Sequence, residues 1–220
     1  LYFFDSATGR WTRGPERNPY RADFYNVTVC STPQGAVAWG DKRDGAGTGL
    51  WRLDAKDRMW RPLDLRGPLP SKSPDQHGMT YDSKRDRLLF FSGSDKNRGD
   101  VAAYDFSSGE ARWLDAKGKT FAAVASRETI YLPEADAVLL GARVAVEGKL
   151  HWLIYDCAEN AWRGIELPGD DPIGKGTAGR TFNNSMGLMY DPNRKLVWAI
   201  GQYSNVHVLR LDKSASRPLR

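Results

Sequence analysis

The amino-acid sequence predicts an all-β protein, a β-propeller built of four-stranded antiparallel blades. One pattern recurs at a nearly fixed period: an apolar or aromatic run that ends in Asp, followed by a polar turn and a Trp. Short apolar stretches joined by tight polar turns lie between these runs, with no helical periodicity. The chain also carries eight Trp, nine Tyr and eight Phe. One small sheet cannot bury both faces, so neighbouring copies must stack, and a ring of blades achieves this.

The third strand of each copy is expected just before a recurring aspartate. These aspartates step by 49, 51, 51 and 56 residues, and they are Asp5, Asp54, Asp105, Asp156 and Asp212. We expect them to accept backbone hydrogen bonds in the following turn. A Trp near the start of the fourth strand follows the first four copies, at steps of 49, 53 and 49 residues: Trp11, Trp60, Trp113 and Trp162. We expect these rings to be packing anchors between blades.

The first two strands of each copy are short apolar segments joined by a turn. First strands are expected at 27–30, 79–81, 129–132 and 188–190. Second strands ending in Gly are expected at 37–40, 90–93, 138–141 and 198–201. Polar turns such as 82–86 and 191–194 fit hairpins between them.

The period, the Gly after the second strand, the aromatic-plus-Asp third strand and the Trp of the fourth resemble kelch repeats of the galactose-oxidase type of propeller. The resemblance covers about residues 1–212. It implies a binding module, or a carbohydrate-active enzyme of the sugar isomerase or oxidase type. Kelch repeats usually carry Gly-Gly where this chain has Trp39-Gly40, Ser92-Gly93, Leu140-Gly141 and Ile200-Gly201. The paired Tyr and His of a galactose-oxidase copper site are absent at the required spacing, which argues against that activity.

The repeat divides the chain into blades and a tail. We expect the end of one blade at 1–14, full blades at 26–64, 77–115 and 128–167, a partial blade at 185–212, and a polar C-terminal tail at 213–220. About four blades are thus visible. Both ends carry a third strand, which predicts a truncated ring of six or seven blades with the missing part mainly upstream.

Composition excludes several classes of protein. No apolar run approaches the roughly 20 residues that a membrane helix needs, so no membrane partner is expected. The net charge of +5 comes from Lys and Arg interleaved with Asp and Glu, which argues against nucleic acid. Cys30 and Cys157 are expected to be free thiols. With three His and no recognisable catalytic motif, we predict no catalytic residues, no metal site and no cofactor.

The candidate site lies on the face that carries the long loops, at the mouth of the central channel. Stepping back four residues from Cys30, Tyr81, Leu132 and Tyr190 gives Asn26, His77, Glu128 and Met186, the first three of which are polar. The predicted ligand-binding set adds nearby polar or aromatic neighbours: Tyr25, Gln76, Arg127, Arg180, Asn183 and Asn184. A small polar ligand such as a sugar would suit this mixed ring, with Tyr25 as a stacking face. The same groups could instead cap strands and bind channel water.

The sequence therefore favours binding over catalysis. The expected partner is a protein or a glycan, recognised through the loops at the channel mouth by a protein that is monomeric as a complete propeller. The enzyme alternative would use Glu128, Arg127, His77 and Arg180. The compartment is not determined, with a preference for a bacterial extracellular or periplasmic setting.

Overall fold

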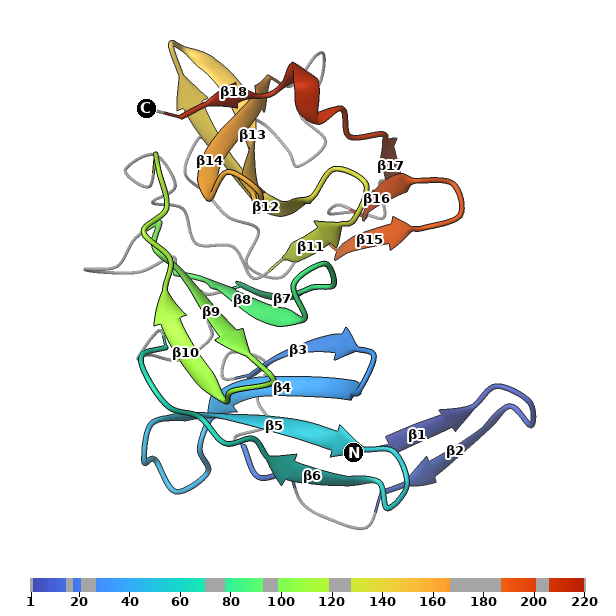
Figure 1. The fold of residues 1–220 in the computed structure, drawn as a ribbon. Helices are drawn as coiled ribbons and strands as arrows, with labels where there is room; N and C mark the ends of the chain where they lie inside the picture. The colour runs from blue at the N-terminus through green and yellow to red at the C-terminus, as the bar shows by residue number, and fades with distance from the viewer. Residues whose placement is uncertain are drawn as a thin grey trace.

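The computed structural model describes residues 2–14, 18–20, 27–69, 78–92, 99–118, 128–166, 187–200 and 206–219, with 142–144 by their backbone alone. The strands in these ranges form antiparallel sheets, four of which we call blades 1 to 4 (Figure 1). Blade 1 contains β3 (Val27–Thr32), β4 (Gly35–Asp41), β5 (Thr48–Asp54) and β6 (Met59–Pro62). Blade 2 contains β7 (Gly78–Asp82), β8 (Arg87–Phe91), β9 (Val101–Asp105) and β10 (Glu110–Trp113).

Blades 3 and 4 complete the arrangement. Blade 3 contains β11 (Thr129–Leu132), β12 (Ala137–Val146), β13 (Lys149–Asp156) and β14 (Ala161–Glu166), and blade 4 contains β15 (Gly187–Asp191), β16 (Leu196–Ile200) and β17 (Val206–Leu209). A separate hairpin of β1 (Tyr2–Asp5) and β2 (Arg10–Arg13) precedes them. A 3₁₀ turn, η5 (Lys213–Ala215), and β18 (Arg217–Pro218) follow. The predicted all-β propeller fold is confirmed.

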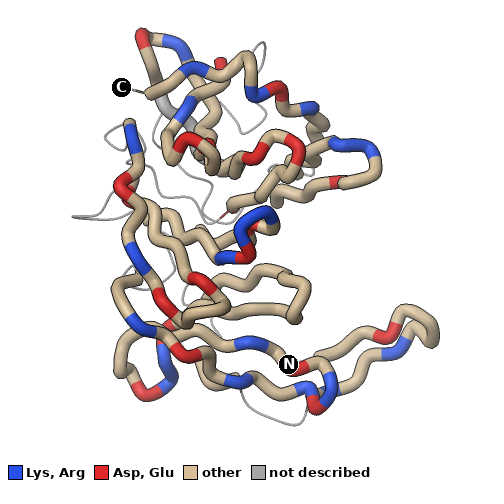
Figure 2. The backbone as a smooth tube through the Cα atoms, viewed as in Figure 1, with Lys and Arg blue, Asp and Glu red and all other residues tan. Residues whose placement is uncertain are grey.

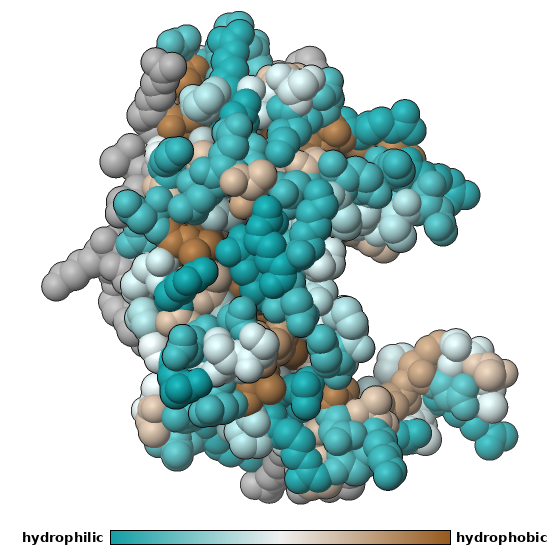
Figure 3. All heavy atoms as spheres, viewed as in Figure 1, coloured by the Kyte–Doolittle hydropathy of each residue, from teal (hydrophilic) through white to brown (hydrophobic). Residues whose placement is uncertain are grey.

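Each blade is a meander whose first strand lies innermost. The order within blades 1 to 3 follows the sequence, and β3, β7, β11 and β15 contact one another in succession. The sheets therefore stand in an arc around these four strands (Figure 1). In the space-filling view the outline is hollowed between the β1–β2 hairpin and blade 4 (Figure 3).

Apolar side chains fill the spaces between successive blades. One cluster joins Trp39 of blade 1 to Phe90 of blade 2, whose rings lie 5.0 Å apart in an edge-on arrangement. A second joins Phe91 of blade 2 to Tyr155 of blade 3, and a third joins blades 3 and 4. The core is thus a series of interfaces between sheets, as the repeat predicts.

The tryptophan anchors differ in their surroundings. Trp162 is 1% exposed, packs on Phe91 of blade 2, and donates its indole N–H to the Gly99 carbonyl at 2.8 Å. Trp11 is 68% exposed on the hairpin. In blade 3, Trp162 lies opposite Tyr155 of the third strand. At the equivalent position of blade 2, Ala111 and not Trp113 lies opposite Tyr104. Trp162 is therefore a fully buried anchor between blades 2 and 3, whereas Trp113 is only partly buried against the cluster between blades 1 and 2.

The recurring aspartates are turn caps, as predicted. In each copy Oδ1 accepts the backbone N–H two residues on, at 2.8 to 3.1 Å: Asp5 from Ala7, Asp54 from Lys56, Asp105 from Ser107, Asp156 from Ala158 and Asp212 from Ser214. These Asx contacts satisfy backbone donors that the hairpin turn leaves unpaired.

The turns between first and second strands link neighbouring blades by polar contacts. Arg85 of blade 2 donates two hydrogen bonds to the Asp136 carboxylate of blade 3, at 2.8 and 2.9 Å. The fully buried Asp82 accepts from Arg85 at 3.1 Å and from Arg87 at 2.9 Å. The Arg85 guanidinium lowers the pKa of Asp136 to about 2. These four side chains, which we call the ionic cluster, join blades 2 and 3. Tyr190 donates to Glu134 between blades 4 and 3.

Short segments after β6 and β10 run along the outer edge of the next blade. Arg66 donates its N–H to the Gly109 carbonyl at 2.9 Å and accepts from the Ala111 N–H at 2.7 Å. In the same way, Lys117 donates its N–H to the Asn160 carbonyl at 3.0 Å and accepts from the Trp162 N–H at 2.9 Å. Both segments, which we call straps, have the pattern Leu-Asp-x-basic-Gly, at 63–67 and 114–118. They extend past the expected blade ends at residues 64 and 115. The repeat is therefore longer than its four strands.

Replacing Gly67 with alanine is expected to lower the free energy of unfolding by about 3 kcal/mol. Gly67 has φ +91°, and an added Cβ would overlap the carbonyl oxygen of Ala111 on the next blade. Gly148 is the matched control, with φ +77° and open space around an added Cβ, so that Gly148→Ala should cost only about 1 kcal/mol. Urea unfolding of the two variants measures the difference, and equal losses would contradict the strap contact.

The C-terminal residues differ from the expected polar tail at 213–220. β18 pairs with β14, and Leu219 is buried while donating its N–H to the Trp162 carbonyl at 3.0 Å. Arg163 donates to the Ser216 hydroxyl at 2.6 Å and to its carbonyl at 2.9 Å. Lys213 forms an ion pair with the buried Asp156 at 3.1 Å. The segment is therefore a fifth strand of the blade 3 sheet, because one apolar side chain and several polar partners hold it there.

Charged residues of both signs are interleaved along all the blades (Figure 2). In the described ranges no helix is long and apolar enough to cross a membrane. Cys30 and Cys157 are free thiols, as expected.

Candidate functional site

The inner strands of the four blades line a groove of about 620 Å³. Its walls are residues 28–31 of β3, 79–81 of β7, 128–131 at β11 and 188–190 of β15, with Ser83 at the turn end. Glu128 precedes β11 and so lies at the end that carries the long loops. The groove thus runs along the axis from the predicted channel mouth to the turn face.

The groove surface mixes hydroxyl, aromatic and aliphatic groups. Val29 and Met189, on the first and last inner strands, are 51% and 55% exposed. Thr28, Ser31 and Thr80 carry aliphatic hydroxyl groups on the first two inner strands, and the hydroxyl oxygen of Thr28 is itself buried. Sugars combine hydroxyl groups with apolar ring faces, so this mixture of groups matches that ligand chemistry.

Three equivalent tyrosines stand at the turn end of the groove. Each pairs with an apolar residue of the second strand in its blade: Tyr81 with Leu88, Tyr131 with Val138 and Tyr190 with Val197. Tyr81 donates to Asp86 at 2.6 Å and Tyr131 to Asp136 at 3.1 Å. Burial, together with these carboxylates, raises the pKa of Tyr81 to about 12 and also raises that of Tyr131. The phenols therefore stay protonated, and each donates its one proton to a carboxylate, which fixes its position at the turn end of the groove.

Cys30 also lines the groove, on β3. Burial raises the pKa of its thiol to about 12. Because the thiolate is the reactive form, this side chain is an apolar wall group at neutral pH and not a nucleophile.

Of the predicted ligand-binding set, the described residues contain Glu128 alone. Its carbonyl accepts the Gly141 N–H at 2.8 Å, and the residue lines the groove. The other candidates lie outside the described residues: Tyr25, Asn26, Gln76, His77, Arg127, Arg180, Asn183 and Asn184. The predicted ring therefore stays a prediction at these positions.

The strand register corrects one alignment step behind that ring. Tyr131, and not Leu132, is the equivalent of Tyr81 and Tyr190. Stepping back four residues from Tyr131 leads to Arg127, one residue before Glu128. The sequence did not distinguish the two positions, because Leu132 and Tyr131 are both plausible strand residues. The register is fixed by the four-residue turn between Leu132 and Ala137, which only the structure shows.

Comparisons with known proteins support the fold. No protein-family model matches the chain, and no curated protein matches it by sequence. The structure resembles TolB from Acinetobacter baumannii with a TM-score of 0.50 and 13% identity, over 99% of this chain and 48% of that one. It also resembles the periplasmic gluconolactonase PpgL of Pseudomonas aeruginosa with a TM-score of 0.53 and 14% identity, over 100% of this chain and 62% of that one.

The chain spans about half to three fifths of the length of these two proteins. At such identities the likeness concerns the fold alone, and fold does not determine function.

Proposed function

We propose that this chain is a binding module that holds a small polar ligand, such as a sugar, in the axial groove and the loops at its mouth. The groove itself carries the proposal. It is lined by four equivalent strands, and it combines hydroxyl groups with exposed apolar surface and with fixed tyrosine hydroxyls at one end. Glu128 adds a carboxylate at the predicted mouth. We further propose that the blades are of the kelch type, on the motifs quoted above.

The arrangement suits reversible recognition. Ligand pockets of comparable size usually combine apolar walls with a few well-placed polar groups. The tyrosine hydroxyls are fixed by Asp86, Asp136 and Glu134, so their positions are set before a ligand arrives. Preorganisation of this kind reduces the entropy lost on binding.

Filling the groove is expected to abolish binding without unfolding the protein. Val29→Arg and Met189→Arg each place a long charged side chain at an exposed position in the groove, and each should weaken the affinity for a glycan-array ligand by at least about tenfold, about 1.4 kcal/mol. The control is Val206→Arg, since Val206 is 55% exposed on β17 and does not line the groove.

Calorimetry with the strongest array ligand measures these affinities, and thermal unfolding checks each variant. Unchanged affinity in both groove variants would contradict the proposal, as would an array and a calorimetric screen without any bound glycan. Binding of a protein surface through outer loops would leave both groove variants fully active.

The enzyme alternative uses the same groove and makes a different prediction. Turnover of a bound sugar derivative should fall when Glu128 is replaced by glutamine, while a binding module would show no turnover at all. The gluconolactonase activity in the name of one similar protein belongs to that protein. For the compartment we propose an extracellular or periplasmic setting, which secretion of the full-length gene product would test.

A further inference from the structure

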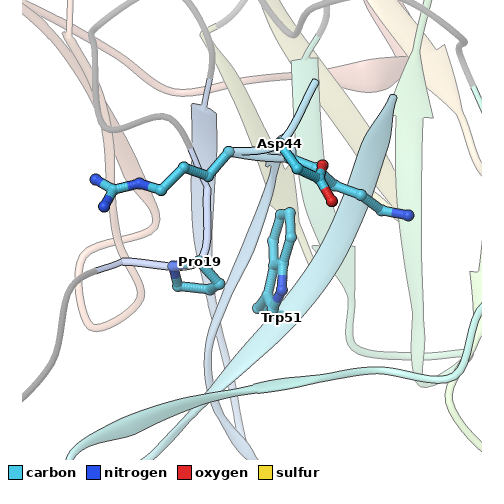
Figure 4. Close-up of a pocket in the computed structure, with 5 residues that line it drawn as sticks. Pro19, Asp44 and Trp51 are labelled. Atoms are coloured by element: carbon cyan, nitrogen blue, oxygen red, sulfur yellow. The ribbon is translucent and has the colours of Figure 1, made fainter. Parts of the chain in front are cut away.

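A second hollow, of about 420 Å³, lies on the loop side of blade 1 and apart from the axial groove. Five residues line it: Pro19, Lys42, Arg43, Asp44 and Trp51. Trp51 belongs to β5, residues 42–44 to the loop between β4 and β5, and Pro19 to the segment that precedes blade 1. Figure 4 shows the Pro19 ring beside the Trp51 indole, with the Asp44 carboxylate above the end of the indole.

Backbone and ring contacts hold this hollow in shape. The Arg43 N–H donates to the Pro19 carbonyl at 3.3 Å, and Tyr20 forms a β-bridge with Lys42. The buried Tyr20 ring packs against Trp51, with centroids 5.6 Å apart. An added Cβ at Gly49 would lie 2.8 Å from the Trp51 ring, so only glycine leaves room for the indole there. The pocket is therefore a product of packing and not a chance gap between mobile side chains.

The charges around the hollow are unbalanced. Two cations, Lys42 and Arg43, and one carboxylate, Asp44, line it, and one oxygen of Asp44 already accepts the Ala46 N–H at 2.9 Å. In the part of the chain that the structure describes, neither cation has an ion-pair partner. The site can therefore receive an anionic group, and the Asp44 carboxylate can accept from a hydroxyl donor.

We propose that this pocket binds a sugar acid, such as a uronate. The carboxylate of the sugar would pair with one of the two cations, Lys42 or Arg43, since hydrogen bonds between ionised partners are the stronger ones. Its hydroxyl groups would donate to the carboxylate of Asp44, which a simple aromatic acid could not do. Its apolar C–H face would lie against Pro19 and the edge of Trp51. The inference extends the proposed binding function to a charged ligand and a separate site.

Sodium glucuronate is the probe, with glucose and sodium acetate as neutral and hydroxyl-free comparisons. Calorimetry or tryptophan fluorescence on the complete 220-residue chain should show saturable binding of glucuronate and at least about tenfold weaker binding of the other two. The double variant Lys42→Gln, Arg43→Gln should weaken glucuronate binding at least about tenfold. Both side chains are on an exposed loop, and thermal unfolding verifies that the variant folds.

Matched variants separate this site from the groove. Lys56→Gln removes an exposed cation from the opposite, turn end of blade 1 and should leave glucuronate affinity unchanged. Met189→Arg, which fills the groove, should also leave it unchanged. No binding of glucuronate, or binding that survives the double variant, would overturn the inference. Binding lost only in Met189→Arg would overturn it too, while supporting the groove as the ligand site.

Discussion

Asp82→Asn is expected to lower the free energy of unfolding by about 3 kcal/mol, because it removes a charge from a buried cluster and leaves its partners in place. Asp82 is fully buried and accepts hydrogen bonds from Arg85 and Arg87. Asparagine keeps the side-chain volume and one acceptor oxygen, so the loss of unfolding free energy reports the contribution of the negative charge. Arg87, 13% exposed, would then face a neutral amide.

Urea unfolding at neutral pH measures this loss, with Glu166→Gln as the control. Glu166 pairs with Lys149 at 2.8 Å, but both side chains are largely exposed, so breaking that pair should cost at most about 1 kcal/mol. A similar loss in the two variants would show that water screens the ionic cluster, and that it does not join blades 2 and 3 as the geometry indicates.

Trp162→Ala is expected to cost about 4 kcal/mol, the range for removing a buried tryptophan from a core. The indole packs on Phe91 and Tyr155, and its N–H reaches the Gly99 carbonyl on blade 2. Truncation would therefore open a cavity in the interface between two blades and leave a buried carbonyl without its donor.

The repeat supplies the control for this variant. Trp11 lies opposite Phe4 just as Trp162 lies opposite Tyr155, but Trp11 is 68% exposed. Trp11→Ala should change stability by less than about 1 kcal/mol. Chemical unfolding followed by circular dichroism compares the two, and a small effect of Trp162→Ala would contradict the role of anchor between blades.

The repeat made much of the fold predictable. Asp5, Asp54, Asp105 and Asp156 marked the end of every third strand, and each is found capping the turn that was expected. A cap is a local interaction between residues two positions apart, so it leaves a clear trace in sequence. Contacts between blades follow from the same periodicity, because each sheet repeats the same apolar faces.

Register and edge contacts were harder to predict. The expected second strands ended at Gly93 and Gly141, whereas β8 ends at Phe91 and β12 at Val146. Glycine is common both in strands and just after them, so it cannot fix a boundary to one residue. Ala111 at an anchor position was missed because Trp113, two residues on, lies on the same face of β10.

For the candidate site, the sequence indicated a channel mouth at the start of the inner strands. The ring expected there stays a prediction, because all its members except Glu128 lie outside the described residues. Glu128 lines the axial groove. The pocket around Trp51 was not predicted, because its parts come from segments about 30 residues apart and meet only through the bridge between Tyr20 and Lys42. The basic straps at 63–67 and 114–118 repeat a visible motif, and a search for periodicity outside the strands could have found them.

The attachment of residues 217–219 to β14 also bears on how the protein acquires its structure during translation. Blade 3 can form its first four strands as soon as residue 166 leaves the ribosome, but its outermost partner is made some fifty residues later. Blade 4 therefore lies in the sequence between two parts of the blade 3 sheet. That sheet can be completed only after the whole of blade 4 has been synthesised.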